Sequence, residues 1–359
     1  MMGTRTIIFL LSLVITSISA GLLYLFLQSN VQTIHIAMIG PMSGENSPEN
    51  GQSHLRGIQM YLDEIKSQNL LPNKKIILDV YDDQNDSELA KQMALKVATE
   101  TNAVAVIGHN YSSSSISAGE VYKKYGLPAI SPSSTNPKVT QNNDWFFRTV
   151  FTNELQGRFL AHYAKKILNQ NTVSVISKDS AYGTYLAKVF QETAQSLGIA
   201  IKYHWQFSAA EGTDLTQQLQ TIVDDLATKP DAGALFLATH ATEGILLLQK
   251  LEEAGIKWPI IAPNAYASKA FKNREIDHSQ QTDYYSGEMY VSAPLLFDSA
   301  SDKASKFRDR YNEIYHDQPD WRTAFAYDAA MVVIAAIEHA AFKAHLILCN
   351  KIDKKFAII

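Results

Sequence analysis

The chain has 359 residues, a formal net charge of −4 at neutral pH and an isoelectric point near 6.2. This length suits two lobes that each bury a core, and the weakly acidic balance without a basic block argues against a nucleic-acid partner. The single cysteine, Cys349, excludes an internal disulfide and a cysteine-based zinc site.

Residues 7–27 form an uncharged, mostly apolar run that follows Arg5. As a helix this run would span roughly 30 Å, which is enough to cross a bilayer. A cleaved secretory signal is the alternative, because residues 17–20 are small or apolar. The apolar run continues past that point, so we favour an uncleaved anchor in the inner membrane. Either reading of residues 1–30 places the rest of the chain in the periplasm or another extracytoplasmic compartment.

Residues 33–150 predict a first α/β lobe. Strand-like runs alternate with helical periodicity, and Asp86 or Ser87 is placed to cap the second helix. This alternation predicts parallel strands joined by right-handed crossovers. The expected strands are residues 33–40, 75–82, 104–108, 128–131 and 145–148.

Residues 151–292 repeat the alternation and predict a second lobe. Its first helix carries Phe159, Tyr163 and Ile167 on one face. Helices at about 301–315 and 323–342 predict a return of residues 293–342 to the first lobe, and residues 343–359 form an atypical tail without clear periodicity. The fold class is therefore α/β, with two doubly wound parallel-sheet lobes joined by a hinge. The expected strands are residues 173–177, 199–205, 233–238, 259–262 and 288–292.

The sequence gives little support for catalysis. It lacks the nucleophile elbow, the zinc-binding histidine pair, the Walker loop and the dinucleotide fingerprint, and its ten histidines show no metal-ligand spacing. The adjacent Asp82 and Asp83 would point to opposite faces of a strand, so we expect one of them to brace a loop. The chain is predicted not to be an enzyme and to need neither a cofactor nor a metal.

Polar and aromatic side chains follow the carboxyl ends of strands in both lobes. In an open α/β sheet these ends line the ligand crevice, and two lobes that face each other can close over a small molecule. The sequence therefore predicts a binding site for a small polar ligand. Its expected residues are Ser112, Ser133, Ser134 and Thr135 in the first lobe and Tyr182, His240 and Asn264 in the second.

Six short motifs between residues 33 and 340 carry a family resemblance. They are Gly40-Pro41-Met42-Ser43-Gly44, Val106-Ile107-Gly108-His109 with Ser112-Ser113-Ser114, residues 130–137, Phe147-Arg148-Thr149, Ala181-Tyr182-Gly183 and Ala326-Tyr327-Asp328-Ala329. Each motif is weak alone, but their order and spacing are specific. With them the chain resembles the type I periplasmic substrate-binding proteins of ABC importers, particularly the branched-chain amino-acid-binding class.

The resemblance implies a solute-binding protein that delivers a small ligand to an ABC permease. It implies that Ser112, Ser133 and Thr135 hold a ligand carboxylate and that Tyr182 closes over it. His240 stands where the amino-acid binders usually carry tyrosine, and Asn264 where they usually place an acidic residue against the ammonium. The ligand is therefore open between an amino acid, an amide, a urea-like compound and an organic acid.

Two further departures from the family pattern leave alternatives open. The family normally continues beyond the helix at 323–342 with strands that return to the second lobe, so the carboxyl end is expected to be truncated. A retained anchor would also suit a membrane-anchored ligand-sensing receptor domain, which is the alternative function.

Overall fold

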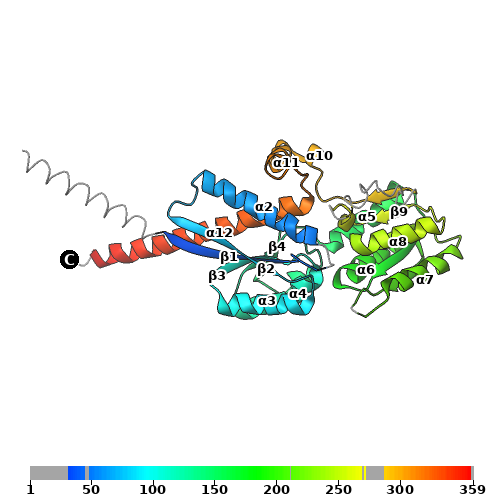
Figure 1. Ribbon diagram of the computed structural model, residues 1–359, viewed down its shortest axis with the longest axis horizontal. Coiled ribbons are helices and arrows are strands. Elements are labelled where there is room, and N and C mark those ends of the chain that lie inside the picture. Colours follow the sequence, from blue (N-terminus) through cyan, green and yellow to red (C-terminus); the bar gives the residue numbers. More distant parts are fainter. Residues whose placement is uncertain (1–30, 45–47, 211, 269–270, 272–286, 357–359) are drawn as a thin grey trace, which may run out of the picture.

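The computed structural model describes residues 31–44, 48–210, 212–268, 271 and 287–356, with side chains as far as Ala340. The predicted membrane anchor, residues 7–27, lies outside the described residues. Two α/β lobes lie side by side along the long axis of the molecule (Figure 1). Each is built on its own five-stranded sheet.

The first lobe has a parallel sheet in the order β2-β1-β3-β4-β5. The alternation of strands and helices predicted this sheet, and all five predicted strands are present. Because β1 lies between β2 and β3, the chain reverses its winding direction there, and the crevice of such a sheet opens at that point. The strands are β1 Gln32–Gly40, β2 Lys74–Asp82, β3 Ala103–Gly108, β4 Ala129–Ser131 and β5 Phe146–Arg148.

Helices cover both faces of this sheet (Figure 1). One face packs against α2 (Pro48–Ser67) and α12 (Trp321–Phe356), and the other against α3 (Ser87–Glu100) and α4 (Ser112–Tyr125). Asp86 is the N-cap of α3 and accepts from the Leu89 amide, as the sequence predicted. A 3-10 turn, Pro137–Val139, follows β4.

The second lobe has a parallel sheet in the order β10-β9-β8-β6-β7 around one hydrophobic core. Here too the predicted strands are confirmed, so the fold class inferred from the sequence is correct. The strands are β6 Thr172–Lys178, β7 Ala200–Phe207, β8 Ala234–Ala238, β9 Ile260–Ala262 and β10 Met289–Val291. The helices are α5 Asn153–Lys166, α6 Ala181–Ser196, α7 Leu215–Ala227 and α8 Ala241–Glu253, with the 3-10 turn Asn264–Tyr266.

The chain then returns to the first lobe through α10 (Phe297–Ala300), α11 (Asp302–Tyr315) and α12. α12 continues to Phe356 instead of ending near residue 342, because residues 343–356 contain neither proline nor glycine to stop it. Among the described residues, Trp321–Ala340 is the one stretch long and apolar enough to cross a membrane. Its inner face, including Ala326, Ala329 and Val333, belongs to the core of the first lobe.

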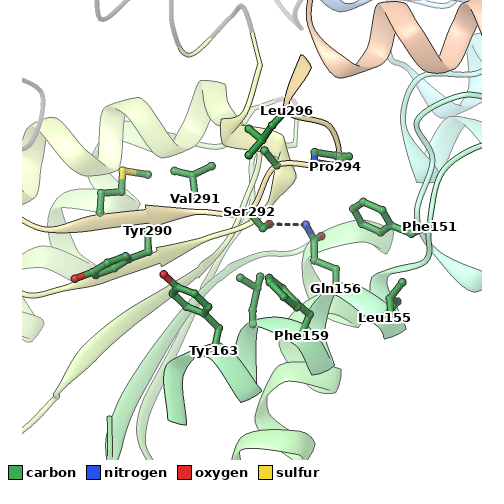
Figure 2. A pocket seen from close by; sticks show the side chains of 13 residues that line it. Phe151, Leu155, Gln156, Phe159, Tyr163, Tyr290, Val291, Ser292, Pro294 and Leu296 are labelled. Carbon is green, nitrogen blue, oxygen red and sulfur yellow. Dashed lines mark hydrogen bonds between the residues drawn. The ribbon is translucent and has the colours of Figure 1, made fainter. Parts of the chain in front are cut away.

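The helix α5 forms as predicted, but its large apolar side chains face outward. Phe159 is 56% exposed and Ile167 is 61% exposed, whereas Gly157 and Leu160 face the interior. A Cβ on Gly157 would lie 2.9 Å from Val189 Cγ1, so α5 approaches α6 through its small residues. The outward face and the β10 edge enclose a groove of about 670 Å³, which Gln156 and Ser292 bridge at 3.0 Å (Figure 2).

Candidate functional site

The carboxyl ends of β3 and β4 in the first lobe face those of β6, β8 and β9 in the second. The loops after these strands, together with the start of α12, surround a small cavity between the lobes. Its volume of about 20 Å³ leaves room for about one water molecule. A molecule the size of an amino acid would therefore fit only if the lobes separated. The lining residues are Asn110, Tyr111, Ser112, Ser133, Thr135, Tyr182, His240, Asn264, Ala265, Trp321 and Arg322.

Six of the seven residues predicted from the sequence line this cavity. The seventh, Ser134, does not. It is buried behind the wall, where its Oγ lies 2.6 Å from Ser115 Oγ and donates to the main-chain oxygens of His109 and Asn110. Ser134 thus supports the turn that presents its neighbours Ser133 and Thr135.

The first-lobe wall combines hydroxyl groups with the start of α4. Ser112 is the first residue of that helix, and the N-cap residue Tyr111 makes no side-chain cap hydrogen bond. Ser112 Oγ accepts from the Asn136 amide at 3.2 Å, while Ser133 Oγ donates to Asn110 Oδ1 at 2.8 Å. The first amides of a helix carry partial positive charge, so this wall suits an anionic group.

A buried network fixes the position of this wall. His109 Nδ1 lies 2.7 Å from Asp83 Oδ2, and His109 Nε2 lies 2.7 Å from Tyr122 Oη. Asp83 also accepts from the Asn85 amide, and Asp82 accepts from the Met42 amide at 2.8 Å. The expectation that one of the paired aspartates braces a loop is confirmed, and both of them do so.

The second-lobe wall is aromatic. The Tyr182 hydroxyl donates to Asn264 Oδ1 at 3.2 Å, and its ring stacks on His240 with centroids 4.6 Å apart. His240 also makes a T-shaped contact with Tyr111 of the first lobe, with ring centroids 4.6 Å apart. The lobes therefore touch across the cavity through a ring from each.

The electrostatics leave these second-lobe side chains neutral near pH 7. Burial lowers the pKa of His240 to about 3, with Glu243 opposing and Lys178 and Arg322 adding to the shift. Burial also raises the pKa of Tyr182 above its usual value. Behind His240, Glu243 forms an ion pair with Lys178, which holds the pKa of that carboxyl low despite its burial.

Hydrogen bonds to main-chain carbonyls link the two lobes beside the cavity. The Asn153 amide at the start of α5 donates to the Thr135 carbonyl at 2.7 Å. The Asn153 side chain donates to the Tyr182 carbonyl at 3.1 Å, and Asn136 of the first lobe donates to the Ala181 carbonyl. Thr135 and Tyr182 are thus linked through one asparagine.

Five lining residues were not predicted: Asn110, Tyr111, Ala265, Trp321 and Arg322. Asn110 and Tyr111 belong to the polar turn before Ser112, so their strand-end position was an available signal. Trp321 and Arg322 lie at the start of α12, and no local sequence pattern indicates that they belong to the site. Their placement depends on tertiary packing: a Cβ on Gly57 of α2 would lie 2.1 Å from the Thr323 carbonyl oxygen.

Comparison with known proteins shows what this chain is similar to. An "Amino acid binding protein" of Pseudomonas aeruginosa is 33% identical over 165 residues, which cover 46% of this chain and 44% of that protein. The leucine-, isoleucine-, valine-, threonine- and alanine-binding protein of the same organism is 24% identical over 86% of this chain and 79% of its own length.

A solved structure agrees with the fold. The substrate-binding protein LivJ of a branched-chain amino-acid transporter from Streptococcus pneumoniae, in complex with isoleucine, superposes with a TM-score of 0.74 at 24% identity, over 84% of this chain and 83% of that one. The sequence model of the periplasmic binding proteins matches residues 33–345. The chain therefore belongs to the periplasmic binding protein family.

Proposed function

We propose that this protein captures a small organic ligand outside the cytoplasm and delivers it to an ABC permease. Closure of the two lobes around the ligand is the output, and the protein performs no reaction. The contact between Tyr111 and His240 carries the proposal, because two rings from opposite lobes that touch across the cavity mark a closed state, and separation of the lobes would break that contact. The proposed hinge crosses at residues 150–151 and 292–293.

The ligand is proposed to carry a carboxylate held by Ser112, Ser133 and Thr135. Hydroxyls and the α4 amides suit such a group, and two of the relatives are named as amino-acid-binding proteins. Tyr182, His240 and Asn264 would then enclose the rest of the molecule from the second lobe. An amino acid or a closely related acid or amide is the expected class.

The proposed site offers a direct test through Trp321, which is buried in the cavity wall. The purified protein is titrated with the twenty amino acids, their amides and their deaminated acids, and both tryptophan fluorescence and heat are recorded. Saturable binding by at least one compound, with a fluorescence change that Trp321→Phe removes, supports the proposal. Silence across the panel from a folded sample overturns it.

A further inference from the structure

Among the described residues that line the cavity, Arg322 alone carries a formal charge at neutral pH. It lies in the first turn of α12 and is 5% exposed. The close approach of α2 at Gly57 fixes that turn against the first lobe. The charge acts across the cleft, since it lowers the pKa of His240 and opposes the upward shift at Tyr182, both of which belong to the other lobe.

The guanidinium of Arg322 lies over the Trp321 ring, 4.3 Å from its centroid, but two of its nitrogens make no hydrogen bond to the residues around it. Its Nε and Nη1 have no hydrogen-bond partner among the described residues. The nearest carboxylate oxygen, Asp320 Oδ2, is 4.0 Å from Nη1, too far for a hydrogen bond. Asp320 uses its other oxygen to accept from Thr323 and lies outside the set of cavity-lining residues. A buried cation with free N–H groups is costly unless an anion meets it.

Nothing else in the described cavity wall supplies that anion. The other lining residues are neutral, and Asn264 contributes an amide where a carboxylate could have stood. Glu243 acts electrostatically on His240, but it lies outside the set of lining residues and forms an ion pair with Lys178. His54, which the Arg322 charge also affects, is neutral at pH 7, because burial and Arg322 lower its pKa to about 3. An ammonium group in this cavity would therefore meet a cation and find no carboxylate.

Resting on the proposed function, we infer that the ligand is a small carboxylic acid without an ammonium group and that Arg322 sets this specificity. The free guanidinium N–H groups donate to the anionic oxygens, in the bidentate manner that arginine favours with carboxylates. The rings of Tyr111, Tyr182, His240 and Trp321 in the wall suit an apolar alkyl or aryl body.

Two matched triplets test the inference with the full chain. One is 4-methylpentanoate, 4-methylpentanamide and L-leucine, and the other is phenylacetate, phenylacetamide and L-phenylglycine. Within each triplet the carbon skeleton is shared; the amide replaces the carboxylate by a neutral group, and the amino acid adds an α-ammonium group. Calorimetric titration should show that the acid of at least one triplet binds tenfold or more tightly than its amide and its amino acid.

Variants then assign the preference to Arg322. Arg322→Met should bring the acid-to-amide ratio of affinities to within threefold of unity, whereas Arg322→Lys keeps the charge and should retain a preference for the acid. The control Arg158→Met removes an exposed charge on α5 and should leave the ratio unchanged. If Arg322 were only structural, its variants would weaken all three ligands alike and keep the ratio. That result overturns the inference.

If Arg322→Met does not fold, the same titrations of the native protein and of Arg322→Lys still test the inference. An amino acid or amide that binds as tightly as its acid to the native protein overturns the inference and leaves the proposed function standing. If neither triplet binds but some other amino acid or amide of the wider panel does, the inference is again overturned and the proposed function stands. Silence of the whole panel overturns both.

Discussion

The imidazole ring of His240 stacks on the phenol ring of Tyr182 with centroids 4.6 Å apart, and its Nδ1 has no hydrogen-bond partner among the described residues. This buried ring has a pKa of about 3, against 6.5 for a free histidine. Below pH 6.5 the His240 side chain therefore binds a proton in the unfolded chain but not in the folded protein. The free energy of unfolding is highest above pH 6.5 and falls as the pH drops from 6.5 towards 3.

The variant His240→Gln should reduce this pH dependence. At pH 5 the native His240 costs roughly 2 kcal/mol of unfolding free energy relative to pH 7, and the variant should be spared that loss. Denaturant unfolding at the two pH values measures it. His54, whose pKa is lowered to about 3 in the first lobe, provides the matched comparison through His54→Gln. A His240→Gln protein that loses as much stability as the native one between pH 7 and pH 5 would contradict the assignment.

Thr135→Ala should weaken ligand binding without unfolding the protein. The Thr135 side chain lines the cavity, and the interlobe hydrogen bond at this position uses its main-chain oxygen, which alanine keeps. Loss of one hydroxyl contact of about 1 kcal/mol corresponds to a roughly fivefold rise in Kd for the tightest ligand of the panel. Thr221→Ala, which removes an exposed hydroxyl on α7, is the matched control. Equal affinity in the two variants would move the site away from Thr135.

Asp86→Ala should lower the stability of the protein without weakening ligand binding. The Asp86 carboxylate accepts from the Leu89 amide at 2.6 Å and caps α3, and Asp86 is not among the lining residues of the cavity. Removing a helix cap costs about 1 kcal/mol of unfolding free energy, which chemical denaturation detects. Ligand affinity, measured by calorimetry on the same sample, should stay at the native value. An affinity loss larger than the stability loss would show that α3 contributes to the site.

The carboxyl ends of parallel strands line the crevice of an α/β sheet, and this rule explains which site residues the sequence could predict. Ser112 and Thr135 follow β3 and β4, and Tyr182 follows β6, so parallel topology alone brings them to one crevice. The rule does not resolve adjacent side chains, which is why Ser134 was included although it points into the turn. Arg322 depends on how α12 packs on α2, a contact between segments about 265 positions apart, and no local pattern encodes that.

Gly57→Ala tests this packing. A Cβ at Gly57 would lie 2.1 Å from the Thr323 carbonyl oxygen and 3.1 Å from Ala326 Cβ, so the first turn of α12 must move. Overpacking of this kind costs about 1–3 kcal/mol, which outweighs the gain of less than about 1 kcal/mol from replacing a helical glycine. Since the turn carries Arg322, ligand affinity should fall as well. Gly40→Ala, where the new Cβ meets only Met38 Cε at 3.6 Å, should change neither quantity; comparable losses in both variants would refute the packing argument.

The apolar stripe of α5 that carries Phe159 faces outward, and two phenylalanines test the reason. Periodicity marks an apolar stripe but does not say which stripe is buried, and the small residues around Gly157 pack more closely on α6 than Phe159 could. Phe159→Ala should therefore cost less than about 1 kcal/mol of unfolding free energy.

Phe190→Ala is the matched change within the core of the same lobe. Phe190 is fully buried and stacks on Phe236 with centroids 3.8 Å apart, so its truncation leaves a cavity and should cost about 3–5 kcal/mol. Urea unfolding of both variants compares the two sites directly. A loss at Phe159 as large as that at Phe190 would mean that the groove between α5 and β10 is covered in the folded protein in solution.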